Sequence, residues 1–430
     1  MIGLGAATLL IVGLVVLVAL GAQIAVALGV VAVLGLWWGT GDWQAVSNLL
    51  AATAYDGLRQ PAYLVIPLLM LMGEFIARSG AVTDIFQVLG RQLRSLPGGA
   101  ALAAAIGQGL YSFVAGASAS SAAGFTRITY PALKRDGHDG ATALGLLASA
   151  AAFGALIPPS VLLTVWGLLA HQPLGPMFLA AVVPAIVAVI LFAGAVLSLA
   201  DKPAVAAEAQ KASLPAHTVE SAMGLLVTLI VILGGIGTRL LTPLEAASVG
   251  AVIGLLMALR KGMRLPAIVE AILVVGRGSA PILLLIFTAQ IYAQALGLTG
   301  AGAAIEHALS GLGLALGLAT MVAAWLILSV VLDQLSIMAL TVALFAPAAA
   351  RMGIDPLAFA VVGVITLEAA QLLPPFGLLV FTAKAAANDD GVALPDIFRH
   401  VLPFLTVMLV LVLILVAFPS IATWLPRLAL

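Results

Sequence analysis

The heptapeptide GALIPPS, residues 154–160, interrupts a long apolar segment, and QLLPPFG, residues 371–377, interrupts a second one. A Pro-Pro pair removes two backbone hydrogen-bond donors and clashes with the preceding turn, so each pair predicts a break in a helix. Broken backbone at membrane depth is tolerated only where it is buried in protein or lines a cavity. Two breaks of the same kind therefore point to a functional site as well as to a fold.

The amino-acid composition indicates the class of protein to which this chain belongs. Of the 430 residues, 63% are hydrophobic and only 8% are charged. A bilayer core about 30 Å thick takes about 20 apolar residues per helix, and segments of this kind recur throughout the chain. We expect an all-α polytopic membrane protein with about ten spanning helices, at 2–20, 22–39, 61–77, 138–170, 174–200, 218–236, 243–259, 279–297, 354–385 and 396–420.

Several classes of function are excluded by the same sequence. Its 18 basic and 18 acidic residues balance, so no nucleic-acid partner is expected. It contains no cysteine, which excludes disulfides and thiol catalysis. It has no GxxxxGK[ST] phosphate loop, so the chain is not itself an ATP-driven pump. No catalytic pair is evident at membrane depth, and we therefore do not expect an enzyme.

The two Pro-Pro pairs also reveal an internal repeat. Pro158 and Pro374 lie 216 residues apart, and the same shift carries Ser120 onto Ser336 without a gap. We expect residues 1–215 and 217–430 to form two repeats of one architecture. Each repeat has scaffold helices, an arm helix (80–96 and 260–278), a re-entrant helical hairpin (97–131 and 312–350) and a broken helix (138–170 and 354–385).

The distribution of basic residues predicts that the two repeats are inverted. Lys and Arg accumulate on cytoplasmic loops. The stretch 78–135 holds Arg78, Arg91, Arg94, Arg127, Lys134 and Arg135, whereas its equivalent, 294–351, holds only Arg351. Counting helices from there places the N-terminus outside and the linker 201–216, with Lys202 and Lys211, inside. Repeats of inverted topology are typical of secondary transporters.

Polar residues near the breaks suggest what the site binds. Half-helix N-termini offer amides to an anion, and the hydroxyls of Ser118, Ser120 and Ser160 suit a hard cation such as sodium. The alternative is that the prolines only kink a helix and the small residues only allow close packing.

Carboxylates at membrane depth are a second signal. We expect Asp333 and Glu368 at membrane depth, where a charge costs several kcal/mol. Each carboxylate therefore either binds a cation or a proton, or makes a hydrogen bond between helices.

Glu74 and Arg78 are one helical turn apart, which predicts a local ion pair.

Residues 116–169, 175–184 and 332–386 resemble the large membrane subunit of tripartite ATP-independent periplasmic (TRAP) transporters. The elements LIPPS (156–160) and GIDP (353–356) are specific to that resemblance, which spans nearly the whole chain. It implies an elevator-type secondary transporter in a bacterial cytoplasmic membrane. It further implies two or more coupled sodium ions, an organic acid substrate, a small membrane subunit of the Q type and a periplasmic substrate-binding protein of the P type.

The resemblance also implies where the ions and the substrate bind. The expected sodium ligands are Ser118, Gly154, Pro158, Asp333, Glu368 and Pro374, and the expected substrate ligands are Ser120, Ser121, Pro159, Ser160, Ser336, Gln371 and Pro375. The second break departs from the family pattern, because Ala370 and Leu373 stand where a Gly and a Thr are usual. We expect Glu368 or Gln371 to replace the missing threonine hydroxyl. The alternative function is a self-sufficient symporter or antiporter that needs no binding protein.

Overall fold

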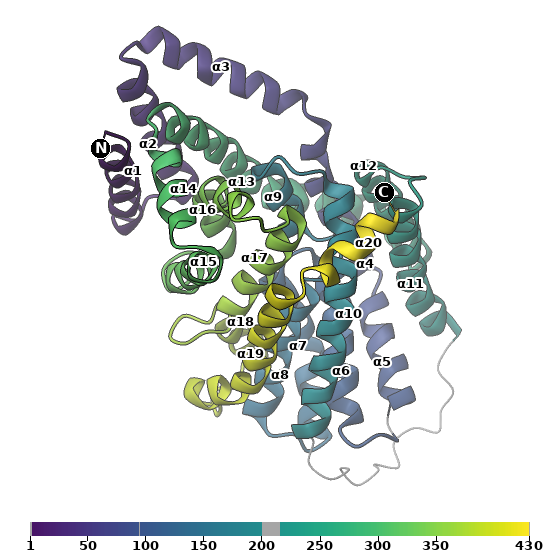
Figure 1. Cartoon of the computed structure of the whole chain (residues 1–430). Helices are drawn as coiled ribbons and strands as arrows, with labels where there is room; N and C mark the ends of the chain where they lie inside the picture. Colours follow the sequence, from purple (N-terminus) through teal and green to yellow (C-terminus); the bar gives the residue numbers. More distant parts are fainter. Residues whose placement is uncertain (1, 94, 200–215, 430) are drawn as a thin grey trace.

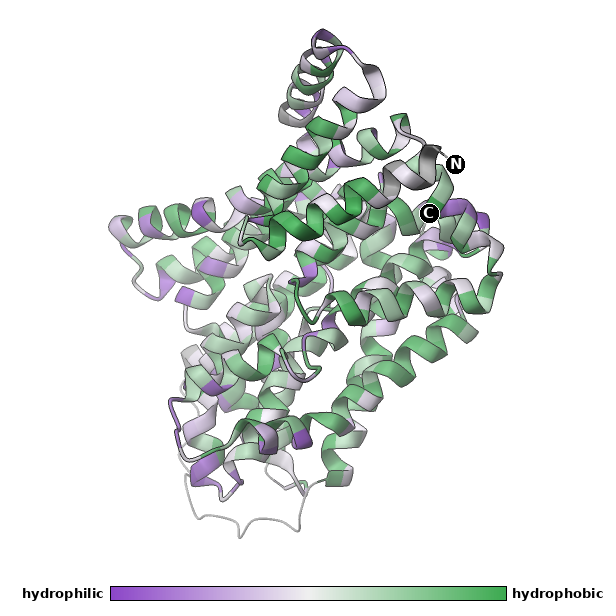
Figure 2. Cartoon of the chain, turned by 90° about the vertical axis from the view of Figure 1, so that its left-hand side faces the viewer, coloured by the Kyte–Doolittle hydropathy of each residue, from purple (hydrophilic) through white to green (hydrophobic). Residues whose placement is uncertain are grey.

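The computed structural model describes residues 2–93, 95–199 and 216–429, and the regular elements in these ranges are all helices. Figure 1 shows how they pack around one another. Hydrophobic residues run along the helices, whereas hydrophilic residues gather at helix ends and loops (Figure 2), as expected of a chain that spans a bilayer. Arg94, Lys202, Lys211 and the linker before Ala216 lie outside the described residues.

The helices divide between the two halves of the chain. The first half contains α1 (Ile2–Ala19), α2 (Ile24–Thr40), α3 (Trp43–Arg59), the 3-10 turn η1 (Pro61–Leu64), α4 (Val65–Arg78), α5 (Ala81–Leu93), α6 (Gly99–Ala115), α7 (Ser118–Arg135), α8 (Gly140–Gly154), α9 (Val161–Leu169) and α10 (Leu174–Leu199). The second half contains α11 (Ala216–Gly237), α12 (Pro243–Arg260), α13 (Leu265–Leu298), α14 (Ala301–Gly311), α15 (Leu314–Leu328), α16 (Gln334–Arg351), α17 (Pro356–Ala370), α18 (Leu378–Ala387), α19 (Leu394–Ala417) and α20 (Ser420–Ala429).

The offset of 216 residues recurs in the helix boundaries. Helices α7 and α16 have the same length and begin at equivalent positions, and so do α8 and α17. Asp139 caps α8 by accepting hydrogen bonds from the amides of the next turn, and Asp355 does the same for α17. The segments expected as hairpins are α6–α7 and α15–α16, and the segments expected as broken helices are α8–α9 and α17–α18.

Four elements differ from the expectation. The expected arm helix 260–278 is not separate, because α13 continues without interruption from Leu265 to Leu298 and includes the expected span 279–297. Helices α3, α14 and α20 have no counterpart in the expectation, and with 17, 11 and 10 residues they are shorter than a membrane span of about 20 residues. Helices α3 and α20 are amphipathic, and Asp42 caps α3 by accepting a hydrogen bond from the Gln44 amide.

Seven described helices are long and apolar enough to cross a membrane. They are Pro61–Arg78, Leu174–Leu199, Thr218–Gly237, Pro243–Arg260, Leu265–Leu298, Gln334–Arg351 and Leu394–Ala417. The segments 138–170 and 354–385, expected to span as broken helices, each divide into two helices that are individually too short. The count of about ten spans therefore stays a prediction.

An aromatic cluster joins the two halves. Trp166 of α9 contacts Trp325 of α15 and Phe359 of α17 edge-on, with ring centroids 5.8 and 5.7 Å apart. The Trp325 indole donates a hydrogen bond of 2.9 Å to the hydroxyl of Thr341 in α16. The half-helix after the first break is therefore held by the hairpin and the broken helix of the second half.

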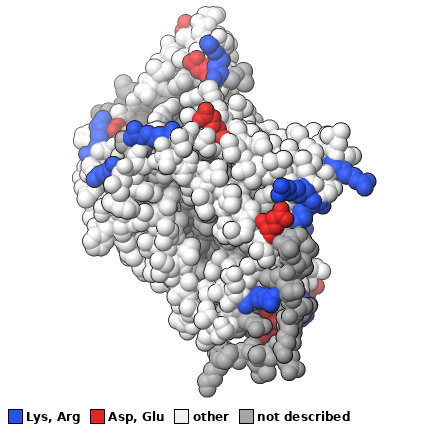
Figure 3. Space-filling model, turned by 90° about the vertical axis from the view of Figure 1, so that its right-hand side faces the viewer, with Lys and Arg blue, Asp and Glu red and all other residues white. Residues whose placement is uncertain are grey.

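Charged side chains are few, and those on the face in Figure 3 form small groups on an otherwise uncharged surface. The predicted pair of Glu74 and Arg78 is confirmed, with 2.6 Å between the guanidinium and the carboxylate, and Arg78 also contacts Glu270 of α13 at 3.0 Å. Lys261 contacts Asp84 of α5 at 2.8 Å. These pairs connect α4 and α5 to α13 and to the turn after α12.

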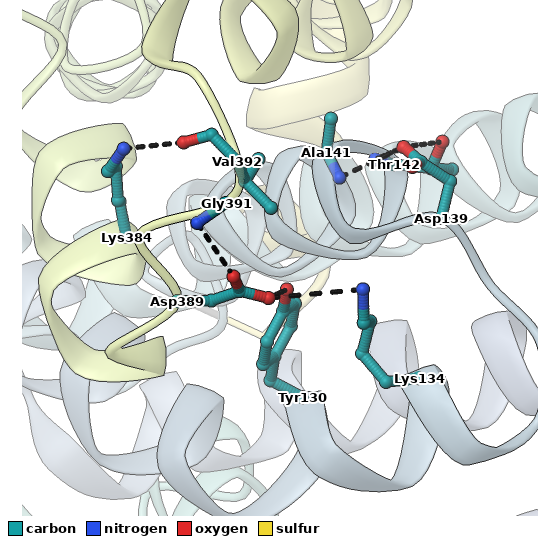
Figure 4. A network of polar contacts seen from close by, with 9 residues as sticks. All are labelled: Tyr130, Lys134, Asp139, Ala141, Thr142, Lys384, Asp389, Gly391 and Val392. Atoms are coloured by element: carbon teal, nitrogen blue, oxygen red, sulfur yellow. Dashed lines mark hydrogen bonds and ion pairs between the residues drawn. The ribbon is translucent and has the colours of Figure 1, made fainter.

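A polar clasp holds the loop between α18 and α19 against α7 (Figure 4). The Tyr130 hydroxyl donates to the Asp389 carboxylate at 2.6 Å, the Gly391 amide donates to it at 3.0 Å, and the Lys134 ammonium lies 3.9 Å away. The hydrogen bond from Tyr130 is the main reason why the pKa of Asp389 lies below its usual value, followed by the Gly391 amide. This clasp connects hairpin α6–α7 to the helix that follows the second break.

We expect Tyr130→Phe to lower the melting temperature at neutral pH by about 2 °C, because Asp389 loses a hydrogen bond that favours its charged form. The stabilisation is present above the pKa that Asp389 has in the unfolded chain, and it is lost as the pH falls through the lower pKa of the folded protein. Melting temperatures of wild type and variant should therefore converge in acid. Tyr55→Phe is the control, since the Tyr55 hydroxyl contacts Arg59 at 3.0 Å, and its effect should not change with pH in this range. A Tyr130→Phe effect that persists below pH 3 would contradict this origin.

Candidate functional site

The two hairpins meet at the N-termini of α7 and α16. The Gln334 amide nitrogen donates a hydrogen bond of 3.4 Å to the Ser118 hydroxyl, and these two residues are 216 positions apart in the chain. Equivalent positions of the two halves therefore touch one another. The expectation named Ser118 but not Gln334, although the repeat offset places Gln334 opposite Ser118.

Glu368 of α17 lies directly beside this contact. Its side chain is completely buried, and it neighbours the Ser118 hydroxyl and the Gln334 amide. Neither carboxyl oxygen has a hydrogen-bond donor in proper geometry, and the side-chain oxygen of Gln334 is buried and unpaired as well. Three buried oxygen atoms without hydrogen-bond donors raise the free energy of the folded protein unless a donor or a cation binds them.

The first break packs tightly against hairpin α6–α7. A Cβ atom at Gly154 would lie 2.3 Å from the Ser112 Cβ and 2.7 Å from the backbone of Gly109. The turn of the hairpin is also close, since a Cβ at Gly116 would lie 3.1 Å from Val161, and its φ of +68° favours glycine. The first break and the first hairpin turn are thus brought together, as expected.

We expect Gly154→Ala to destabilise the protein by about 1–3 kcal/mol, because the backbone of Gly109 has no room to move away from the new methyl group. The measurement is the melting temperature of the purified variant. Gly276→Ala is the matched control, since this glycine also lies within a helix but nothing lies within 4 Å of its Cβ position. The control should gain about 0.5–1 kcal/mol. A destabilisation no larger at Gly154 than at Gly276 would contradict the close contact.

The serines near the first hairpin turn have separate roles. Ser121 is buried, and its hydroxyl contacts the Ser112 hydroxyl at 2.6 Å, donates to the Ser118 carbonyl at 2.8 Å and accepts from Gln108 at 3.2 Å. Ser112 in turn donates to the Ala151 carbonyl of α8 at 3.1 Å. Ser120 instead lies at the surface of the tip, where its hydroxyl donates to the Ala117 carbonyl. Of these serines, Ser118 contacts the second hairpin directly.

The second hairpin turn ends at Asp333, which caps α16. Its carboxylate accepts from the Leu335 and Ser336 amides at 3.1 and 3.4 Å and from the Ser336 hydroxyl. Asp333 is exposed, whereas Ser336 is buried. Asp333 and Ser336 therefore use part of their hydrogen-bonding capacity to cap α16.

The two breaks differ sharply in exposure. Pro158, Pro159 and Ser160 are buried, but Pro374, Pro375 and Phe376 are exposed. Ser160 is 6% exposed and its equivalent, Phe376, is 59% exposed. The half-helices continue the contrast, because Leu162 and Val165 of α9 are buried whereas their equivalents in α18, Leu378 and Phe381, are exposed.

The packing of the half-helices explains this contrast. Helix α9 packs against α4 and α13, as well as against α16 and α10, whereas the main neighbours of α18 are α7, α8 and α19. Gln371 is buried and its carbonyl accepts from the Leu379 amide at 3.3 Å, which bridges the second break. The first break is thus sealed by neighbouring helices, and the second break is open.

Comparison with known proteins identifies the family to which this arrangement belongs. A family model described as "Tripartite ATP-independent periplasmic transporter, DctM component" matches residues 11–421. The chain belongs to the DctM family. The resemblance predicted from the LIPPS and GIDP elements is confirmed. This DctM-family chain is a large permease subunit of a TRAP transporter, a multi-pass membrane protein and not an enzyme.

Relatives of the chain carry related descriptions. The C4-dicarboxylate TRAP transporter large permease protein DctM of Pseudomonas aeruginosa is 28% identical over an alignment that covers 88% of this chain and 89% of that protein. The isethionate TRAP transporter permease protein DctMQ of Oleidesulfovibrio alaskensis is 24% identical over 87% of this chain and 59% of its own length. Both are described as permeases of TRAP transporters.

A solved structure shares the fold. The YdaH transporter of Alcanivorax borkumensis, whose crystal structure is described as having an unusual topology, superposes with a TM-score of 0.64. The superposition covers 88% of this chain and 90% of that protein, at 16% sequence identity. Since the identity is low, this likeness bears on the fold alone.

Proposed function

We propose that this DctM-family subunit carries out sodium-coupled uptake of an organic acid across the cytoplasmic membrane by an elevator mechanism. The observation that carries the proposal is the contact between the hairpin tips, where Ser118 meets Gln334 beside the buried Glu368. A site formed by equivalent points of two repeats suits alternating access, because each repeat controls one side of it. The basic ends of α7 and α12 face the cytoplasm in this proposal.

Sodium is the coupled ion because the unpaired atoms at the site are oxygen acceptors. The Glu368 carboxyl and the Gln334 amide oxygen form a set that suits a hard cation, and a cation offsets the cost of a buried carboxylate. The first sodium ion would lie between the first hairpin turn and the break at Gly154 to Pro158. The second would bind Glu368 and Gln334, with Asp333 and Pro374 near its entrance.

The organic acid would bind where the half-helices expose amides and hydroxyls. Of the expected substrate ligands, Ser120 at the tip of the first hairpin and Pro375 at the open break are exposed. Among the relatives, one is named for a C4-dicarboxylate and one for isethionate, a sulfonate. A small organic anion is the substrate class that suits both amide donors and a neighbouring sodium ion.

Two protein partners complete the proposed transporter. A small membrane subunit would brace the scaffold within the bilayer, and a periplasmic binding protein would deliver the substrate. The name DctMQ of the isethionate relative, together with its greater length, supports the first partner. The rival proposal is a self-sufficient symporter or antiporter.

Reconstitution into proteoliposomes tests the dependence on partners. The chain is reconstituted alone, with the small subunit, and with the small subunit plus binding protein, and uptake of labelled succinate and isethionate is measured under an inward sodium gradient. We expect uptake only when all three proteins are present. Uptake by the chain alone would favour the self-sufficient transporter and overturn the tripartite proposal.

A further inference from the structure

A cavity of about 620 Å³ lies away from the hairpin tips. Helices α3 and α13 form most of its wall, and the turn between α9 and α10 contributes His171. None of Ser118, Gln334 and Glu368 lines it. Its polar lining consists of Thr53, Asp56, Gln60, His171, Gln290 and Gln294.

The one carboxylate in this lining has no partner among the described residues. Arg59 is one helical turn from Asp56, but its guanidinium donates to the Tyr55 hydroxyl at 3.0 Å and lies over the Tyr55 ring, 5.0 Å from its centroid. The cavity lining contains no Lys or Arg. Asp56 is exposed, and it therefore gives the cavity a negative charge that Arg59 does not neutralise.

Gln294 connects the two helices that form most of the wall. Its amide nitrogen donates a hydrogen bond of 2.9 Å to the Thr53 hydroxyl, which fixes the direction of the side chain between α13 and α3. The amide oxygen is buried within the wall. Asp56 is therefore the charged acceptor that the lining presents to a ligand.

The volume of the cavity and its apolar lining residues indicate what kind of ligand fits. A volume of about 620 Å³ far exceeds that of a water molecule or a bare metal ion. Apolar residues, among them Leu49 and Leu298, complete the lining. The ligand therefore needs a positively charged donor group at one end and an apolar body at the other.

We propose that this cavity binds an organic ammonium ion. The ammonium group would lie against the Asp56 carboxylate, and the apolar body would lie against Leu49 and Leu298. The site is separate from the proposed transport site, and its ligand would contact both α3 and α13 and the turn that bears His171. Binding there is a property of the chain that does not depend on transport.

Calorimetry with the purified full-length chain tests this proposal, with benzylammonium as the probe. We expect saturable binding that Asp56→Asn weakens about tenfold or more, because a charge-assisted hydrogen bond is lost. Benzyl alcohol and benzoate, which have the same ring but no ammonium, should bind about tenfold more weakly than benzylammonium. Asp136→Asn, at an exposed carboxylate outside the cavity, should leave binding unchanged.

Three results would overturn the proposal. Binding of benzyl alcohol as tight as that of benzylammonium would mean that the ring enters by its apolar surface alone. Unchanged affinity in Asp56→Asn, or an equal loss in Asp136→Asn, would mean that the charge of Asp56 does not select the ligand. Absence of any saturable binding by the folded wild-type chain would mean that the cavity is not an ammonium site. Melting curves of both variants verify that each one folds.

Discussion

A cysteine placed at Phe376 is expected to react with a charged, water-soluble maleimide at least about tenfold faster than one placed at Ser160, because labelling rates follow access to the thiolate. The two positions are equivalent in the repeat, but Phe376 is 59% exposed and Ser160 is 6% exposed. The chain has no cysteine of its own, so each variant carries a single thiol. The comparison is therefore matched in sequence position, chemistry and background.

The physical reason lies in the neighbours of the two half-helices. Helix α9 is covered by α4 and α13, while the exposed side of α18 lacks such a cover. A charged reagent does not partition into hydrocarbon, so reaction at position 376 also requires that the open break faces water rather than lipid. In the proposed orientation we expect this side of the protein to face the cytoplasm.

Labelling in membrane vesicles of defined orientation provides the measurement. Inside-out vesicles should expose the Phe376→Cys thiol, and right-side-out vesicles should protect it. Labelling after denaturation must be equal for both variants, which controls for expression. Equal rates in the native protein, or no labelling at either position, would contradict an open second break.

The second large effect is expected at Glu368. Glu368→Gln should reduce sodium-driven uptake by at least about tenfold, because the amide does not supply the negative charge that the proposed cation needs. The fold should tolerate the change, since replacing a buried carboxyl by a neutral group of the same size removes a desolvation cost. Uptake and melting temperature are measured on the same reconstituted preparation.

Glu220→Gln is the control for Glu368→Gln. Glu220 is an exposed carboxylate that contacts Arg260 at 2.9 Å, so its loss should change neither uptake nor sodium dependence appreciably. Gln371→Ala separates the two candidates for replacing the threonine hydroxyl at the second break. If Glu368→Gln and Gln371→Ala both retained wild-type uptake and sodium stoichiometry, neither side chain would belong to a cation site.

Much of the fold follows from local signals in the sequence. The Pro-Pro pairs dictate helix breaks because proline has no amide proton, and they predicted where α8 and α17 end to within a few residues. Apolar length predicted most of the long helices. The sequence did not predict α3, because a search for long apolar segments does not detect an amphipathic helix with one polar face.

The site was only partly predictable, because it depends on contacts between distant segments. The sequence indicated Ser118 and Glu368 separately, but their proximity to each other and to Gln334 results from packing between the two repeats. The tight packing of Gly154 against Gly109 likewise depends on how α6 approaches α8. The different exposure of the two breaks depends on which helices cover α9 and α18, and equivalent Pro-Pro motifs contain no signal for it.

In the proposed function, an inward sodium gradient drives uptake through the complex of this chain with its two partners. The direct measurement is accumulation of labelled substrate in proteoliposomes that contain the complete complex, with an inward gradient of either sodium or potassium at equal ionic strength. We expect accumulation above the external concentration with sodium and no accumulation with potassium. Equal accumulation under both gradients would contradict sodium coupling.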